Sequence, residues 1–472
     1  MGALMVQGVS SGAGKSLITC ALCRSLSRRG IRAAPFKAQN MSNNARVVDG
    51  GEIGTAQWLQ ALAAGVTPDV RMNPVLLKPE SDIRSQVVVM GRVDRELTEA
   101  AWRGRSARLW PHVLDAYRSL AAEHEVIVLE GAGSPAETNL WADDIVNMAM
   151  AEAADAPVLL VADIDRGGAF AHLFGTWALL PAPWQERVEG FLLNKFRGDA
   201  SLLDPAPTDL EARTGVPTVG VVPWLDHALP DEEGPSRRES PRVSGRRVAL
   251  VCGPYGSNLD EFARLQQVAQ VTLVGDHSRI GDVDLVILPG SKHVAADLAW
   301  LRATGLAGQI SDAAARGVPV IGICGGMQAL GTRLDDPDGV EGAAEGLALL
   351  PLATTYAVAK RTDRTSARFD DLPKAWSWLE GREVQGYEIR HGRTDPTSPV
   401  LRAVLPDGLG YAHGNVLGVY LHGVFEGDEV LEAFSGHAPA PVDAVFDHLA
   451  DVLDESIDGQ WLERVLEREQ GR

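Results

Sequence analysis

The segment GVSSGAGKS at residues 8–16 is the most informative part of the first half of this chain, and it follows shortly after the apolar run at residues 3–6. A glycine-rich turn between a buried strand and a helix lets backbone amides approach phosphate oxygens. Its lysine can neutralise the β and γ phosphates, and its serine hydroxyl can bind Mg²⁺. The stretch therefore predicts a nucleoside triphosphate site. The ATP-binding residues expected in it are Gly8, Ser11, Gly12, Gly14, Lys15 and Ser16.

The glycine spacing of this loop differs by one residue from the common G-x-x-x-x-G-K-S pattern. Val9 stands where that pattern has its first glycine, and Gly8 precedes it. We interpret the longer loop as the mark of a subclass of phosphate-binding loops. A glycine-rich turn without a ligand is the alternative, but a Gly-Lys-Ser sequence between strand and helix is specific enough to disfavour it.

Short β-rich runs alternate with helical patterns around this loop. The runs lie at residues 3–6, 126–129, 158–161, 191–193 and 219–222. This alternation predicts a doubly wound parallel sheet, and we place the first α/β domain at residues 1–228.

A magnesium-phosphate site needs carboxylates at strand ends, because the ion takes hard oxygen ligands. Glu130 ends one buried run and is followed by Gly131-Ala132-Gly133, where the backbone can approach a ligand. Glu52 is a second candidate at a loop-to-helix junction. The alternative for Glu52 is a helix N-terminal charge that interacts with the macrodipole, and the residues alone leave both open.

A second turn, GICGG at residues 322–326, has the form of a nucleophile elbow with cysteine in place of serine. The following helix N-terminus lowers the pKa of a thiol in such a turn, and adjacent amides, that of Gly325 among them, can form an oxyanion hole. His422 follows a strand-like run near the end of the same half and could act as the base. Cys324 and His422 are therefore the candidate catalytic pair.

Domain organisation follows from composition and pattern. Residues 229–246 are charged, rich in Pro and Gly and without apolar periodicity, which is typical of a linker. A second alternating series, with β-rich runs at 247–251, 285–288 and 318–323, predicts another α/β domain at residues 247–435. The tail at 436–472 has apolar residues at helical spacing and is interpreted as a helical cover.

Composition excludes several classes of function. The 472 residues carry a formal net charge of −19, whereas a nucleic-acid surface needs clustered Lys and Arg. We expect neither export nor membrane insertion, because no signal-like start and no apolar run of about 18 residues occur. The four cysteines are too few for a disulfide framework and indicate a reducing cytoplasm. Cys20 and Cys23 are expected to pack in an apolar helix stripe.

The chain resembles the cobyric acid synthases, the glutamine-dependent amidotransferases of cobalamin biosynthesis. The resemblance covers both domains and is carried by six segments. They are PFKAQNMSNN at 35–44, EGAGSPAE at 130–137, DIVNM at 144–148, NKFRGD at 194–199, PGSK at 289–292 and YLHG at 420–423. In that family the first domain is similar to dethiobiotin synthetase, and the second is a class I glutaminase of flavodoxin-like fold.

The resemblance implies a role for each candidate residue. Cys324 would be the nucleophile and His422 its base, releasing ammonia from glutamine. ATP and Mg²⁺ would be held by Lys15, Ser16, Glu52 and Glu130. Lys37 would steady the transferred phosphoryl group, and Asn194 would contact the adenine unless it only caps a loop. The other substrate would be adenosylcobyrinic acid a,c-diamide, amidated through acyl phosphates on its b, d, e and g carboxylates; a homo-oligomer is left open.

The chain departs from the pattern of these relatives at several positions. Class I glutaminases usually have Glu two residues after the histidine, where this chain has Val424, and the spacing of Glu426 would point it elsewhere. No third member of a triad is therefore assigned. Gly12 replaces an acidic loop residue and His293 replaces an asparagine, and neither change removes a reacting group.

Three other interpretations compete with this one. The sister enzyme that amidates the a and c carboxylates shares both domains, but residues 37–44 fit it less well. A P-loop regulator of the partitioning type would carry a second lysine where this chain has Ser10, and it would need no glutaminase. A cell-wall amidotransferase usually divides the two activities between separate chains.

Overall fold

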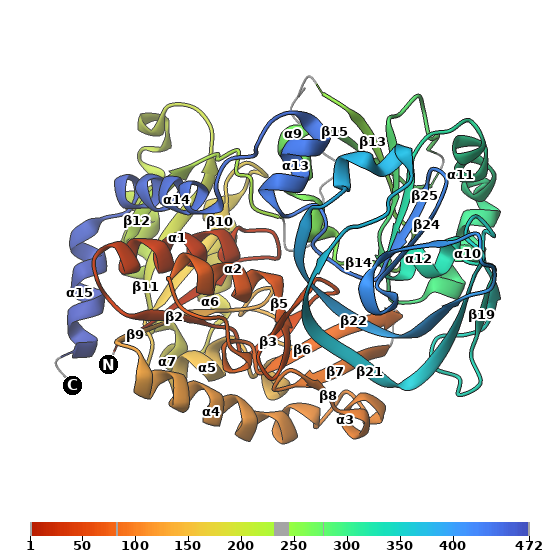
Figure 1. Ribbon diagram of the computed structural model, residues 1–472. Coiled ribbons are helices and arrows are strands. Elements are labelled where there is room, and N and C mark those ends of the chain that lie inside the picture. The colour runs from red at the N-terminus through yellow and green to blue at the C-terminus, as the bar shows by residue number, and fades with distance from the viewer. Residues whose placement is uncertain (1, 82–83, 231–244, 277, 471–472) are drawn as a thin grey trace.

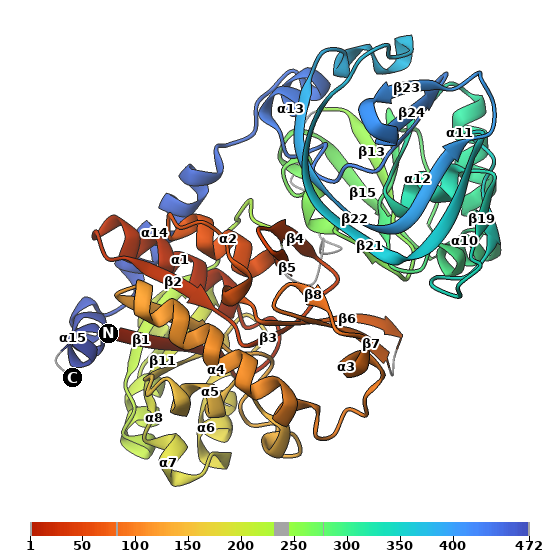
Figure 2. The ribbon, with the colours of Figure 1, turned by 60° about the horizontal axis from the view of Figure 1, so that its bottom comes forward.

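The computed structural model describes residues 2–81, 84–230, 245–276 and 278–470, and it forms two α/β lobes (Figures 1 and 2). The phosphate-binding loop lies in one lobe and the cysteine elbow in the other. Most of the expected linker at 229–246 falls on residues 231–244, which lie outside the described residues.

The first lobe is built on a six-stranded sheet with the strand order β12-β11-β10-β1-β9-β2. All of its neighbouring strands are parallel, which confirms the doubly wound α/β class. The five predicted runs all lie within its strands. These strands are β1 (Gly2–Gly8), β2 (Ala33–Phe36), β9 (Val126–Glu130), β10 (Val158–Asp163), β11 (Val188–Phe196) and β12 (Thr218–Pro223).

Alternating side chains of this sheet pack into two separate hydrophobic cores. Ala3 and Met5 of β1 face one core, whereas Leu4 and Val6 face the other. The first core is covered mainly by α4 (Arg105–Glu123), α5 (Met148–Ala153), α6 (Ala169–Leu179) and α8 (Ala206–Thr214). The second is covered by α1 (Lys15–Arg28), α2 (Thr55–Ala63), α14 (Val442–Ser456) and α15 (Gly459–Gln470). Cys20 and Cys23 are buried in the second core, as the apolar stripe predicts.

The C-terminal helices return to the first lobe and cover its sheet (Figure 1). After α13 (Asp428–Ser435) the chain crosses over, and Trp461 of α15 is buried beside β11, where its indole nitrogen donates to the Glu189 carbonyl at 2.9 Å. Ion pairs such as Arg24 with Asp447 at 2.8 Å join α1 to α14. The expected helical cover therefore packs on the domain at the opposite end of the sequence.

The second lobe is built on a seven-stranded sheet with the order β15-β13-β16-β18-β25-β24-β23. The strands from β15 to β25 are parallel, and β24 and β23 add an antiparallel edge. The expected runs match β13, β16 and β18. The strands are β13 (Arg247–Val251), β15 (Gln270–Val274), β16 (Leu285–Leu288), β18 (Val320–Ile323), β23 (Arg402–Leu405), β24 (Gly410–His413) and β25 (Val416–Val419).

A long antiparallel ribbon of β21 (Leu352–Arg368) and β22 (Glu383–Pro396) belongs to the second lobe and reaches the first lobe (Figure 2). It meets the hairpin of β4 (Ala45–Val48) and β5 (Gly51–Gly54), which belongs to the first lobe. A small sheet packs against that hairpin and is formed by β3 (Gln39–Met41), β6 (Val75–Ser81), β7 (Arg84–Val89) and β8 (Arg92–Val93). None of these strands is among the expected ones.

The remaining elements are short. In the first lobe they are α3 (Arg95–Glu99), α7 (Ala182–Gln185), η1 (Val70–Met72), η2 (Trp141–Asp143) and η3 (Ala200–Leu203). In the second they are α9 (Leu265–Val268), α10 (Val294–Ala303), α11 (Leu306–Ala315), α12 (Gly325–Leu330), β14 (Gly256–Ser257), β17 (Gly290–Ser291), β19 (Arg333–Asp335), β20 (Ala344–Glu345), η4 (Leu259–Phe262), η5 (Lys374–Leu379) and η6 (Pro406–Gly408).

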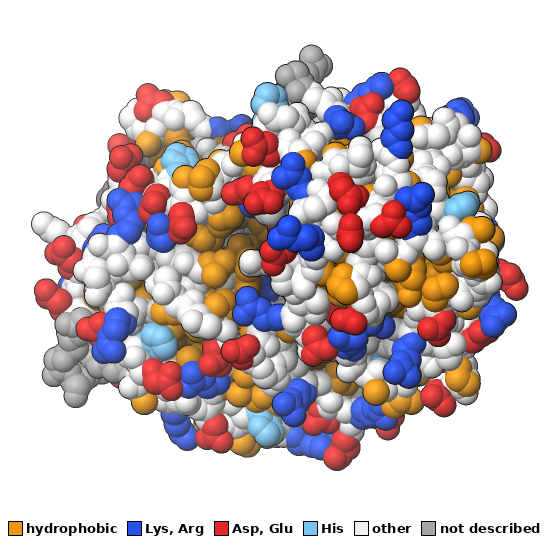
Figure 3. Space-filling model, in the orientation of Figure 1, with side chains coloured by type: hydrophobic (Ala, Val, Ile, Leu, Met, Phe, Trp, Pro, Cys, Tyr) orange, Lys and Arg blue, Asp and Glu red, His pale blue; other side chains and the backbone are white. Residues whose placement is uncertain are grey.

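Acidic and basic side chains are interspersed over both lobes on the face drawn in Figure 3. Within the described ranges, no helix has the length and apolar character needed to cross a membrane.

Candidate active sites

The cysteine elbow is a strained turn at the end of β18. Cys324 has φ 51° and ψ −105°, a left-handed backbone that a non-glycine residue adopts only when its surroundings enforce it. The flanking glycines make the turn sterically feasible. A Cβ on Gly322 would lie 2.4 Å from the Gly326 backbone, and one on Gly326 would lie 2.1 Å from the Leu288 carbonyl oxygen. The turn thus presents the thiol at the start of α12, as the elbow pattern predicts.

Cys324 and His422 are brought together, as the sequence predicts. Their side chains lie close enough to interact, although Cys324 comes from the middle of the domain and His422 from near its end. Both are buried, His422 at 2% exposure and Cys324 at 6%. The ring of His422 stacks on that of Tyr387 with centroids 5.1 Å apart and 13° between planes, which fixes its orientation.

Glu261 supplies the carboxylate that the sequence leaves unassigned. Its Oε1 lies 2.9 Å from His422 Nδ1, and its Oε2 accepts a hydrogen bond of 2.8 Å from the Gly423 amide. Glu261 belongs to the short turn η4 and is completely buried. Val424, at the position where relatives of this class carry Glu, is part of the apolar core. Glu426 forms an ion pair with Arg46, in agreement with the expectation that it points elsewhere.

The environment of His422 favours its charged form. Burial alone would lower the pKa of the imidazole, but the adjacent Glu261 carboxylate and Cys324 outweigh burial and raise this pKa to about 10. Cys324, His422 and Glu261 thus follow one another as a candidate nucleophile, base and orienting carboxylate.

The backbones of Gly325 and Ser291 approach each other closely at the residue that follows Cys324. Gly325 opens α12, and a Cβ built on it would lie 2.7 Å from the Ser291 amide nitrogen. The strands β14 and β17 hold Ser291 in place, and Ser291 Oγ donates to Asp297 at 2.6 Å. Gly325, the residue expected at an oxyanion hole, thus lies next to a second backbone donor.

In the first lobe the phosphate-binding loop joins β1 to α1. Gly12 and Gly14 have φ values of 70° and 97°, the left-handed region in which glycine carries no steric penalty. Lys15 Nζ donates to the carbonyl oxygens of Ser10 and Gly133, at 3.1 Å each. Gly8 is buried at the end of β1, whereas Ser11 lies on the exposed side of the loop.

Glu130 is the centre of the contacts below this loop. One of its carboxylate oxygens accepts hydrogen bonds from Ser16 Oγ and Lys37 Nζ, at 2.8 Å each. The other accepts one from Gln60 of α2 at 2.5 Å. The structure therefore brings together three of the predicted residues, Ser16, Lys37 and Glu130. A serine hydroxyl beside a carboxylate is the donor set that Mg²⁺ prefers.

Asn194 and its neighbour Lys195 close the other side of the loop. Asn194 donates a hydrogen bond to the Ala13 carbonyl oxygen at 2.9 Å. This bond caps the loop, which is the alternative to a contact with adenine that the sequence leaves open for Asn194. Lys195 Nζ donates to the Gly12 carbonyl oxygen at 2.6 Å and pairs with Asp163 at 2.9 Å. Lys195 is not among the site residues that the sequence predicts, although its segment is one of those that carry the family resemblance.

Glu52 has different surroundings from those expected of a metal ligand. Its Oε1 accepts from Lys360 Nζ at 2.6 Å, and its Oε2 pairs with Lys78. Burial would raise the pKa of Glu52, but these lysines hold it well below the usual range. Lys360 comes from the other lobe, so Glu52 joins the two domains. A metal ion bound by Glu52 would have to displace at least one of these lysines.

The fold and the two sites define a class of protein that combines a nucleotide-binding domain with a glutaminase domain. Residues 4–234 match the family model described as CobQ/CobB/MinD/ParA nucleotide binding domain. Residues 247–430 match the model described as CobB/CobQ-like glutamine amidotransferase domain. The chain is thus a glutamine-dependent amidating enzyme with a nucleotide-binding domain.

Curated relatives identify the family. A cobyric acid synthase of Variovorax paradoxus (strain S110) is 53% identical over 98% of this chain and 99% of its own length. One of Paracidovorax citrulli (strain AAC00-1) is 55% identical over 97% of each chain. The chain belongs to the cobyric acid synthase family, which confirms the resemblance drawn from its motifs.

Proposed function

We propose that the chain converts adenosylcobyrinic acid a,c-diamide to adenosylcobyric acid by amidating the b, d, e and g carboxylates, with glutamine as nitrogen donor and ATP as activator. The observation that carries this proposal is the presence on one chain of a Cys324–His422–Glu261 array and a Ser16–Lys37–Glu130 phosphate site. Membership in the cobyric acid synthase family supports the substrate.

The glutaminase half would release ammonia in two steps. The Cys324 sulfur attacks the side-chain amide carbon of glutamine, and the amides near Gly325 hold the resulting oxyanion. His422 gives its proton to the departing ammonia, which leaves a thioester on Cys324. Water, activated by His422, then breaks the thioester and releases glutamate. Glu261 keeps the imidazole oriented and stabilises its charge throughout.

The synthetase half would activate one carboxylate at a time. A carboxylate oxygen attacks the γ phosphorus of ATP, ADP leaves, and ammonia then displaces phosphate from the acyl phosphate to give the amide. Lys15 and Lys37, which lie at the phosphate-binding loop and at Glu130, would neutralise charge on the transferred phosphoryl group. The backbone from Gly8 to Gly14 would cradle the other phosphates, with Ser11 and Gly12 on the open side of the loop.

The hydroxyl of Ser16 and the carboxylate of Glu130 would hold Mg²⁺, which when bound would supply Lewis-acid stabilisation of phosphate charge. Lys37 donates to the same Glu130 oxygen, and its ammonium group would neutralise charge on the phosphoryl group. Asn194 lies beside Gly14 and would face the nucleotide. The four unpaired cysteines fit the proposed reducing cytoplasm.

The proposal is tested by following ATP hydrolysis and product mass with glutamine, with and without adenosylcobyrinic acid a,c-diamide. Four successive acid-to-amide conversions, each coupled to ATP hydrolysis, are the expected result. No change in the mass of the corrinoid, together with activity on another carboxylate, would discard the substrate while keeping the amidotransferase.

A further inference from the structure

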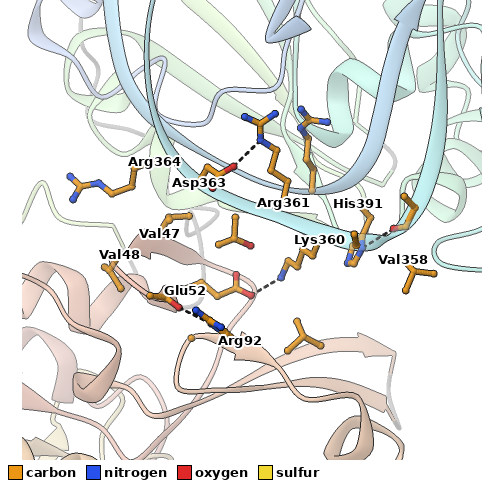
Figure 4. Close-up of a pocket in the computed structure, with 18 of the residues that line it drawn as sticks. Val47, Val48, Glu52, Arg92, Val358, Lys360, Arg361, Asp363, Arg364 and His391 are labelled. Carbon is orange, nitrogen blue, oxygen red and sulfur yellow. Dashed lines mark hydrogen bonds and ion pairs between the residues drawn. The ribbon is translucent and has the colours of Figure 1, made fainter. Parts of the chain in front are cut away.

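A cavity of about 1190 Å³ lies between the two domains and is not part of either candidate active site. One wall is formed by residues 47–52 of the first lobe with β8 and the start of α3. The other is formed by residues 357–364 and 390–393 of the β21–β22 ribbon. Figure 4 shows Lys360 reaching across this space to Glu52, with Arg92 on the same side as Glu52. The volume is that of a site for a sizeable organic ligand.

The lining of this cavity is strongly basic. It holds seven lysine and arginine side chains against three carboxylates, on a chain whose formal net charge is −19. Two of the cations, Arg92 and Arg95, come from the first lobe. The other five belong to the ribbon and are Lys360, Arg361, Arg364, Arg390 and Arg393. Such a concentration of positive charge in a concave site attracts a negatively charged ligand.

Part of this positive charge is balanced within the protein. Lys360 pairs with Glu52, while Arg361 and Arg390 both pair with the buried Glu388, at 3.1 and 2.7 Å. Arg364 and Arg393 are exposed on the ribbon. Within the ranges that the structure describes, no carboxylate pairs with either of these two arginines. They are therefore available to bind carboxylates of a ligand bidentately.

The cavity also lies between the two chemical sites. Strand β22 passes the thiol, since Cys324 Sγ lies 3.6 Å from the carbonyl oxygen of Ile389, and His391 two residues later lines the cavity. On the opposite wall, Glu52 lies just before α2, whose Gln60 donates to Glu130 of the phosphate site. From Thr55 to Gln60 this helix rises only about 7.5 Å. A ligand in the cavity is thus close to both halves of the reaction.

From these observations we propose that the cavity binds the polycarboxylate substrate, with Arg364 and Arg393 recognising carboxylates that are not reacting at that moment. This inference rests on the proposed function, because it assigns a place to the corrinoid of that reaction. Several carboxylates on one ring suit several cations around one cavity. Holding the non-reacting carboxylates would let successive carboxylates be presented toward Glu130 in turn.

The test is equilibrium dialysis of adenosylcobyrinic acid a,c-diamide against the full-length protein without ATP, read from the absorbance of the corrinoid. We expect the Kd to rise about tenfold with Arg364→Gln and again with Arg393→Gln, since each removes a charge-assisted contact. The control is Arg368→Gln, an exposed arginine further along the same strand and outside the cavity, which should leave the Kd unchanged. Thermal unfolding verifies that each variant is folded.

The outcomes separate this inference from the proposed function. Equal Kd values for the wild type and the Arg364→Gln, Arg393→Gln double variant would overturn the cavity assignment, even if the wild type amidates the corrinoid normally. A rise in the KM for glutamine with an unchanged corrinoid Kd would also overturn it, because the cavity would then serve glutamine. A wild type that neither binds nor amidates the corrinoid would overturn the proposed function and the inference together.

Discussion

Glu261 Oε1 lies 2.9 Å from Nδ1 of His422, across a separation of 161 residues in the sequence. The adjacent Asp260 faces the other domain, where it accepts hydrogen bonds from Arg46 at 2.5 Å and from Thr55 at 3.1 Å. Two consecutive carboxylates therefore connect the base of one active site to the surface of the other domain. We expect the orientation of His422 to depend on this contact between the domains.

Replacing Glu261 with Gln should lower the glutaminase rate by about 10²- to 10⁴-fold, because the amide neither stabilises the imidazolium nor fixes its tautomer. Turnover with added ammonia should persist, since it bypasses His422. Glutamate release is the measurement. Glu429→Gln, an exposed glutamate on α13, is the control and should behave like the wild type. A full glutaminase rate in Glu261→Gln would mean that Glu261 has no part in catalysis.

The Glu261–His422 pair should also make stability depend on pH. The folded-state pKa of His422 is raised to about 10, above the ordinary value of about 6.5, so the pair stabilises the fold fully below pH 6.5. This contribution is lost as the pH rises toward 10. The difference in Tm between wild type and Glu261→Gln should shrink over that interval. A constant difference from pH 6.5 to 10 would contradict the charged state assigned to His422.

Replacing Asp260 with Asn leaves the buried guanidinium of Arg46 with only part of its countercharge. Breaking such a buried pair costs about 3–5 kcal/mol, so the Tm should fall clearly. The glutaminase rate should fall as well, because Asp260 anchors the turn that carries Glu261. Arg402→Gln, which breaks an exposed pair with Asp371, serves as the control for ion-pair loss alone. An unchanged Tm and rate would show that the domain contact is dispensable.

Replacing Glu130 with Gln should lower the rate of amidation about 10²-fold or more with either nitrogen source. Ser16 and Lys37 would lose the carboxylate that they share, and the metal ion would lose a ligand. The measurement is ATP hydrolysis that depends on the corrinoid. Glu137→Gln, in the same segment, is the matched control and lies on the exposed side of that loop. Retained ATP hydrolysis in Glu130→Gln would place the metal elsewhere.

Cys324→Ala should remove glutamine-dependent amidation and preserve ammonia-dependent amidation, because the variant loses only the release of ammonia from glutamine. Product mass with each nitrogen donor measures both activities. The loss of both in a folded variant would contradict separate sites for ammonia release and acyl activation.

Local patterns in the sequence are enough to predict most strands of the first parallel sheet, the α/β class of the second domain, and Cys324 and His422 as a candidate pair. Buried strands read as apolar runs, and a nucleophile elbow needs glycines beside its cysteine. The role of Glu261 cannot be predicted from local patterns. It lies in a short turn without hydrophobic periodicity, and only the tertiary fold brings it to His422. The same holds for Glu52, whose lysine partners come from β6 and from the other domain. The ribbon of β21 and β22 has largely polar, exposed strands that lack the apolar runs of the sheets.

The most direct test of the central claim is to supply glutamine labelled with ¹⁵N in its amide group, together with ATP and adenosylcobyrinic acid a,c-diamide, and to determine the label in the product. We expect ¹⁵N in all four new amides with the wild-type chain and in none with Cys324→Ala. Amides without the label, or an unchanged corrinoid in the presence of glutamine hydrolysis, would contradict the coupling of the two sites on this chain.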